Sequence, residues 1–170
     1  MTDKLEIDHG VLVDWVNNSE NMTQDSRKLS EKCRDYYDSK QWTGEEVRKL
    51  EQQKQAATVS NRIKPKMDSL MGMESTNRTT AKAFPRNPSH QGQAEAATEA
   101  IRFVLQNNAF EVTRSSAFEN MLIEGTGGCE IIVKPEKDKE YKVVINPIFW
   151  DRLFYDPHSR RKDFSDARYL

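Results

Sequence analysis

The feature of this sequence that most constrains its fold is a pair of strand-like runs near its C-terminal end. In each run, alternate positions carry apolar or sulfur-bearing side chains: Cys129, Ile131 and Val133 in the first, and Tyr141, Val143 and Ile145 in the second. Because successive side chains of a strand point to opposite faces, each set lies on one face. The connection 135–140 is charged and too polar to bury. The sequence therefore predicts a β-hairpin with one apolar face and a solvated loop.

The segment after this hairpin is rich in aromatic residues, namely Trp150, Phe154 and Tyr155. A large aromatic ring buries roughly 150–250 Å² when it is packed, so water is a poor environment for all three. Pro147 and Pro157 bracket the segment and exclude a long helix or a central strand. We expect a stiff aromatic loop clamped on the apolar face of the hairpin, with the three aromatic residues as structural anchors.

Helical periodicity accounts for most of the remaining sequence. It predicts helices at about residues 23–40, 43–55, 65–78, 91–108 and 110–124. The break between the last two is short, which predicts an antiparallel helical hairpin beside the β-hairpin. The fold class expected is therefore α+β, with helices packed against a β-hairpin or a small antiparallel sheet.

Local signals mark several helix ends. Thr43 and Glu46 have the spacing of a capping box, and Gly125 suits a left-handed C-terminal cap. At the third helix, Asn61 is a good N-cap, but Pro65 prefers the first turn. We place the start of the regular helix at about Pro65, after an irregular entry.

Met67, Leu70 and Met71 share one face of this third helix. Methionines at helical spacing can form an adaptable contact surface, because their side chains are flexible and polarisable. Packing into a core is the more frequent explanation for an apolar helix face, and it is the interpretation favoured here.

The composition points to a domain with a thin core. Apolar residues make up 36% of the chain and charged residues 31%, and the net charge is −1. Residues 1–22 are expected to form a flexible arm, which is either a docking arm or a weak first helix, and residues 23–170 form one unit. A near-neutral chain has no global basic field that would attract nucleic acid. A core this small favours a subunit that shares surface with neighbours.

The sequence gives no sign of a secreted or membrane-spanning chain. It has no signal-peptide pattern and no apolar run near the roughly 18 residues of a membrane span. Cys33 and Cys129 stand alone, without a CxxC pair, which is typical of reduced thiols in a cytoplasmic protein. No interaction with a membrane is expected.

The search for catalytic chemistry yields one weak candidate. The glycine-rich turn 125–128 runs from helix to strand, whereas a phosphate loop runs from strand to helix, so no nucleotide site is expected there. Acidic residues and a histidine near the C-terminal end could ligate a metal: Asp151, Asp156, His158, Asp163 and Asp166. Their spacing matches no standard metal loop. The chain is therefore not expected to be an enzyme or to bind a cofactor. The alternative is a metal-dependent nucleic-acid enzyme that uses Asp151, Asp156, His158 and Asp163.

A basic run at Arg160, Arg161 and Lys162 follows the aromatic segment. Such a run can contact phosphate or an acidic neighbouring subunit. A short run between acidic residues is more often solvated. A nucleic-acid binding module that uses these residues with nearby aromatics remains a third possibility, and its binding would depend strongly on salt.

Four segments in the same order carry a family resemblance: CRDYYDSKQWTGEEV, NRIKPKMDSLMGMESTNR, FENMLIEGTGGCEI and WDRLFYDPHSRRKDFSDARYL. Together they resemble the N-terminal part of portal proteins of short-tailed (podovirus-type) tailed phages, over about Arg34 to Leu170. The resemblance implies a structural protein without catalytic residues of its own. Known members are longer than this chain, so it is expected to be a fragment whose residues belong to the outer wing region.

The resemblance also implies a set of partners. Portal subunits form a homo-oligomeric ring, usually of twelve copies, at one capsid vertex of the virion, and the ring assembles in the host bacterial cytoplasm. Double-stranded DNA passes through its channel during packaging and ejection. The terminase motor, tail-adaptor proteins, and capsid and scaffolding proteins are the expected partners.

Overall fold

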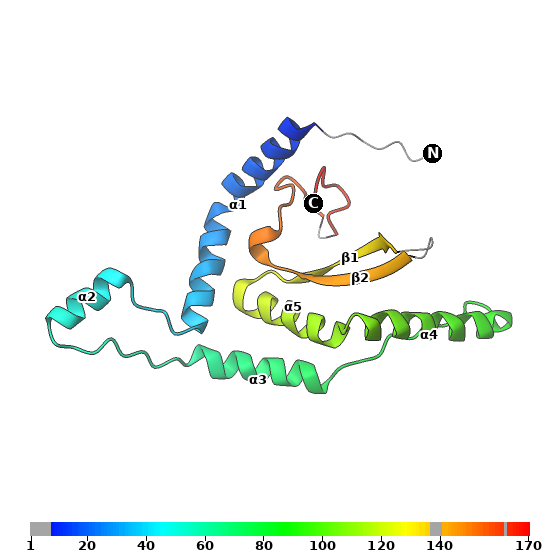
Figure 1. Cartoon of the computed structure of the whole chain (residues 1–170), viewed down its shortest axis with the longest axis horizontal. Helices are drawn as coiled ribbons and strands as arrows, with labels where there is room; N and C mark the ends of the chain where they lie inside the picture. Colours follow the sequence, from blue (N-terminus) through cyan, green and yellow to red (C-terminus); the bar gives the residue numbers. More distant parts are fainter. Residues whose placement is uncertain (1–7, 137–140, 162) are drawn as a thin grey trace.

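The computed structural model describes residues 8–136, 141–161 and 163–170 (Figure 1). The helices are α1 (His9–Tyr37), α2 (Gly44–Gln52), α3 (Ile63–Thr76), α4 (Gln91–Asn107) and α5 (Phe110–Glu124), and the strands are β1 (Gly128–Pro135) and β2 (Tyr141–Ile148). Short 3-10 helices, η1 (Pro88–His90) and η3 (Trp150–Arg152), are also present. The α+β class predicted from the sequence is confirmed. The molecule is elongated, with α2 and the start of α4 at opposite ends of its long axis.

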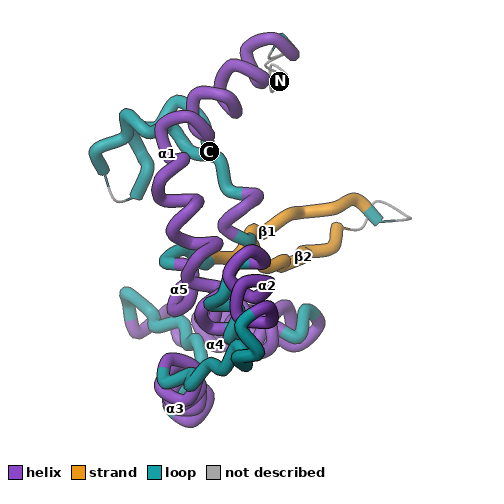
Figure 2. Tube along the Cα trace, turned by 90° about the vertical axis from the view of Figure 1, so that its left-hand side faces the viewer, coloured by secondary structure: helices purple, strands orange, loops and turns teal. Residues whose placement is uncertain are grey.

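Helix α5 is the centre of the fold. It contacts α1, α3, α4 and both strands, and Figure 2 shows the hairpin projecting away from the helices that surround its base. Few apolar side chains are buried: among the described residues they are Tyr37, Ala94, Ile123 and Ile145. The elements are therefore held around α5 with a minimal apolar core.

The β-hairpin is confirmed, with Ile131 opposite Ile145 and Val133 opposite Val143. Its apolar face is covered only in part. Ile145 is buried, but Ile131 is 70% exposed and Val133 59% exposed. On the β2 side of this face Val143 is half-buried and Ile145 buried, whereas Ile131 and Val133 on the β1 side are exposed. Residues 137–140 of the predicted loop lie outside the described residues.

The side chain of Asn108 ties the helices to the hairpin. Its Nδ2 donates to the carbonyl oxygen of Val143 at 3.0 Å, and its Oδ1 accepts from the backbone N–H of Ile145 at 3.0 Å. An amide side chain presents the same donor and acceptor pair as a strand backbone. Asn108 therefore pairs with the outer edge of β2 in place of a further strand.

The predicted antiparallel pairing of the last two helices is wrong. Helices α4 and α5 follow one another end to end, in the same general direction (Figure 1). The backbone N–H of Asn108 still bonds to the carbonyl of Val104 in the helical manner, and only Ala109, at φ 47°, adopts a left-handed conformation. One left-handed residue bends the path without reversing it. The extended segment 79–85 instead runs beside α4, where the Ala83 N–H donates to Thr98 Oγ1.

The first helix begins earlier than predicted. Helix α1 starts at His9, so residues 9–22 of the expected arm are helical, and residues 1–7 lie outside the described residues. The C-terminal segment supplies contacts to this half of α1. Such contacts with a distant segment leave no local signal in residues 1–22. Leu29 on α1 is 61% exposed.

Several local predictions are confirmed. Thr43 and Glu46 form a complete capping box at α2, and Gly125 ends α5 at φ 84°. Helix α3 starts at Ile63, slightly before the predicted start at Pro65, because Asn61 Oδ1 accepts from the backbone N–H groups of Ile63 and Lys64. The expected core packing of the α3 methionines is wrong, because no residue of α3 is buried.

Gly127 gives a direct test of the contact between β1 and α5. A Cβ at this position would overlap the carbonyl oxygen of Ala117 and lie 2.8 Å from the backbone nitrogen of Met121. Gly127→Ala is expected to lower the free energy of unfolding by about 2 kcal/mol, the usual cost of overpacking. Chemical denaturation measures this free energy of unfolding.

Gly72 is the matched control, because a Cβ there meets nothing within 4 Å. Gly72→Ala in the interior of α3 is expected to stabilise the chain by about 1 kcal/mol. Equal effects of the two substitutions would contradict the close approach of Gly127 to α5.

Candidate functional site

The C-terminal segment 149–170 packs on helix α1 and forms the candidate site. Arg27 reaches it from α1: Nη2 donates to the carbonyl oxygen of Leu153 at 2.6 Å, and the guanidinium lies 4.7 Å from the ring centre of Phe154. Such a stacked cation is attracted to the negative face of the ring. The predicted clamp of this loop on the hairpin's apolar face is therefore wrong in its partner, which is α1.

The other two predicted anchors are half-buried. Trp150 lies in η3. The backbone N–H of Tyr155 donates to Ser19 Oγ at 3.2 Å, and its ring lies 5.5 Å from that of Phe164. Ser19 is fully buried, so its small side chain lets the segment approach α1 closely.

A second contact joins the N-terminal half of α1 to the end of the segment. The rings of Trp15 and Tyr169 stack with their centres 4.9 Å apart and their planes 9° apart. Asn18 Nδ2 also donates to the Tyr169 hydroxyl at 3.2 Å. The apolar patch around Trp15 was visible in the sequence, but its partner lies about 150 residues away in the chain and no local pattern could indicate it.

Asp156 holds the segment in shape. Its carboxylate is 2% exposed and accepts from Arg168 Nε at 2.7 Å and from the backbone N–H of His158 at 3.0 Å. These hydrogen bonds, led by that from the Arg168 side chain, hold the pKa of Asp156 well below its usual range. The carboxylate is satisfied by groups of the segment itself.

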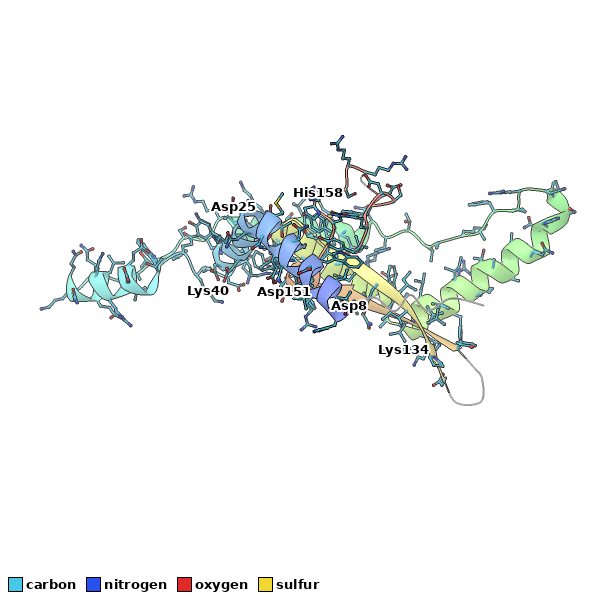
Figure 3. The ribbon with its side chains drawn as sticks, turned by 90° about the horizontal axis from the view of Figure 1, so that it is seen from above. Asp8, Asp25, Lys40, Lys134, Asp151 and His158 are labelled. Carbon is cyan, nitrogen blue, oxygen red and sulfur yellow. The ribbon has the colours of Figure 1, made fainter. Side chains whose placement is uncertain are left out.

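The expected metal set does not converge. Asp151 and His158 are exposed and lie apart from each other in Figure 3. Asp163 accepts from the backbone N–H of Ser165 at 3.2 Å, as in an ordinary turn. Within residues 8–136, 141–161 and 163–170, no group of three or more His, Cys, Asp or Glu side chains is placed to hold a metal ion.

The basic run lies on the exposed turn after Asp156. The backbone N–H groups of Arg160 and Arg161 donate to the Asp166 carboxylate at 2.9 and 3.3 Å, and Arg161 Nη1 donates to Ser165 Oγ at 3.0 Å. The hydrogen bond from Ser159 and those from the two backbone groups lower the pKa of Asp166. Lys162 lies outside the described residues. Asp166 therefore shapes this turn and sets a negative charge beside its arginines.

An apolar groove of about 720 Å³ opens between the N-terminal half of α1 and the segment. Its lining is mainly apolar and includes Leu12, Trp15, Val16, Ile148, Phe149 and Tyr169. On the adjoining turns of α1, Val11 and Val13 are 39% and 43% exposed. Apolar side chains thus face outward on several sides of this helix, which is the pattern of a contact surface.

Arg34 joins α1 to α5, and no sequence signal predicted it. Its Nε donates to Glu124 Oε1 at 2.7 Å, and Nη2 donates to Asn120 Oδ1 at 3.1 Å. Burial lowers the pKa of Arg34, but the hydrogen bonds to Glu124 and Glu119 outweigh it, so the net pKa is raised. The guanidinium stays charged and bridges the two helices.

Glu74 joins α3 to α5 in the same way as Arg34 joins α1 to α5. Its carboxylate accepts from Arg114 Nε at 3.0 Å and from Ser115 Oγ at 3.0 Å, both on α5, and from Arg78 Nε at 3.3 Å. These bonds, led by that from Arg78, lower the pKa of Glu74. Ionic contacts therefore take the place of an apolar interface between α3 and α5.

Comparison with known proteins settles the family. Residues 13–170 match the family model described as Phage P22-like portal protein. The chain belongs to this family. The portal resemblance stated from the sequence is confirmed, and the match includes the first half of α1, which the resemblance did not cover. Comparison with curated proteins gives no match.

As a P22-like portal chain, the molecule has a structural role in the phage particle. Membership of this family does not favour the metal-dependent enzyme considered from the sequence. The carboxylate of Asp156, one of its candidate ligands, accepts a hydrogen bond from Arg168. No helix in the described part of the portal chain combines the length and the apolar character needed to cross a membrane.

The Asp156–Arg168 contact predicts a pH dependence. Because the pKa of Asp156 is lowered in the folded state, its contribution to stability is complete above the ordinary aspartate pKa of about 4 and is lost as the pH falls below it. Asp156→Asn is expected to unfold at a lower temperature than the native chain at pH 7, and the difference should narrow below pH 4.

Thermal unfolding between pH 7 and pH 3 measures this difference. Asp163→Asn is the matched control, because that exposed carboxylate has a backbone N–H as its hydrogen-bond donor. A constant gap between Asp156→Asn and the native chain over the whole pH range would contradict the ionic contact.

Proposed function

We propose that this chain is the wing-region part of a subunit in a portal ring of twelve copies at one capsid vertex. The ring forms the conduit through which double-stranded DNA is packaged and ejected. It also serves as the docking platform for the terminase motor and tail-adaptor proteins, and it contacts capsid and scaffolding proteins. Assembly takes place in the host bacterial cytoplasm. Family membership over residues 13–170 supports this proposal.

The accessible surface of these residues is consistent with an assembled subunit. The chain of 19.7 kDa exposes 13813 Å², whereas a compact monomeric protein of that mass exposes about 8600 Å². The excess is roughly 5000 Å² on this scaling. A polypeptide with so much uncovered surface gains stability when further parts of the protein or neighbouring copies cover it.

The size of the excess suits a ring. Each member of a cyclic ring has two neighbours and uses a different face for each. Obligate interfaces bury about 2000–5000 Å² in total, half from each partner, so two of them cover about 2000–5000 Å² of each copy. The excess surface of the chain reaches the upper end of this range.

The charge balance is consistent with a wing position rather than a DNA-lining one. The net charge is −1, and Asp166 lies beside Arg160 and Arg161. Binding of DNA through counterion release requires several free cations along one surface. We therefore assign DNA contacts to the ring channel and expect weak DNA binding by this chain.

The ring predicts the mass of the purified chain. Light scattering coupled to size exclusion of the full-length protein is expected to give a multiple of its subunit mass that matches a closed ring. Negative-stain electron microscopy of the same fraction should show annular particles. The physical reason is the burial of the excess surface by neighbouring copies.

A lasting monomer at high protein concentration would contradict the proposal. Tight, strongly salt-dependent binding of DNA by the monomer would instead support a nucleic-acid binding module.

A further inference from the structure

The outer edge of β1 has unpaired backbone groups. Asn108 bonds to the backbone of Val143 and Ile145, so these two residues point their N–H and C=O groups away from β1. In an antiparallel pair, residues that lie opposite each other have the same hydrogen-bonding character. Val133 and Ile131 are their partners in the register, so the backbone groups of both point away from β2.

Nothing in the described part of the chain covers this edge at Ile131 and Val133. No backbone hydrogen bond joins either residue to a group outside the hairpin, within the described residues. Their side chains are 70% and 59% exposed, and Tyr141 on the same face is 74% exposed. Figure 2 shows this part of the hairpin extending beyond the helices. The two edges of the hairpin therefore differ, since β2 is paired by Asn108 and β1 is open.

An open edge of this kind is a template for another strand. Main-chain hydrogen bonds supply affinity when an extended segment adds to an edge, and alternate side chains supply specificity. Proteins usually protect such edges with charged residues, proline or bulges. Here Lys134 and Pro135 protect the end of β1, but Ile131 and Val133 lie before them.

The occupant that the proposed ring favours is a second copy of this protein. The residues expose roughly 5000 Å² more than a compact monomer of their mass, which leaves room for the roughly 800 Å² per partner of a standard interface. In a ring the contact is heterologous, so a segment other than β1 of the neighbouring copy must supply the strand.

We propose that the outer edge of β1, at Ile131 and Val133, accepts an extended segment of the adjacent copy and continues the two-stranded sheet across the boundary between subunits. The exposed face formed by Ile131, Val133 and Tyr141 is covered by the same neighbour. This inference rests on the proposed ring, and it names the surface through which neighbouring subunits join.

Hydrogen exchange on the assembled chain tests the proposal. The backbone amides of Ile131 and Val133 are expected to exchange at least about tenfold more slowly in the ring than in the chain dissociated by dilution, because each gains an acceptor. The amide of Ile132 faces β2 in both states and serves as the internal reference.

A substitution provides an independent measurement. Ile131→Pro removes the outward N–H while leaving the bonds between β1 and β2 in place, and it is expected to weaken assembly at least tenfold. Ile131→Val keeps the N–H and a β-branched side chain, and it should assemble like the native chain. Circular dichroism checks that both variants fold.

The outcomes separate this inference from the proposed function. If rings form but the amides of Ile131 and Val133 exchange at the same rate in both states, the inference is overturned and the ring stands. A closed two-copy assembly joined by β1 against β1 overturns it as well, because that contact is isologous. A chain that never assembles overturns both.

Discussion

Helix α5 is the element on which the rest of the structure depends, and polar side chains make several of its contacts. Among its buried residues are Thr113, Asn120 and Glu124, beside the apolar Ile123. Arg34 reaches it from α1, and Glu74 from α3. Hydrogen bonds of this kind add little net stability, but leaving one partner unpaired is costly. The fold is therefore directional and specific around α5 without being strongly stabilised by apolar burial.

This balance explains how the chain suits assembly. Conformational entropy opposes folding, and a single domain normally offsets it with an apolar core. In this portal chain much of the apolar material lies on the surface instead: on the first half of α1, on the β1 side of the hairpin and at Phe84, which is 78% exposed. Neighbouring copies can supply the missing burial. Structural specificity within the chain and stability from its neighbours are thus separate contributions.

Sequence reasoning predicted the features that depend on neighbours along the chain. The hairpin, the capping box at Thr43 and the left-handed cap at Gly125 follow from spacing and backbone sterics. It missed contacts between distant segments, such as Trp15 with Tyr169, because neither residue has a local signal for its partner. The direction of α5 after α4 depends on one left-handed residue, Ala109, and an alanine does not predict a left-handed conformation. Asp156 is a residue type that commonly ligates metals, and only its buried position beside Arg168 shows its structural role.

The central claim is that association with other copies completes the stability of this chain. The most direct measurement is the midpoint of thermal unfolding as a function of protein concentration. Because assembly stabilises the folded state by mass action, the midpoint is expected to rise steadily with concentration, and the assembled and folded signals should disappear together. A midpoint that stays constant over a hundredfold range of concentration, with a sharp transition typical of a self-sufficient domain, would contradict the account.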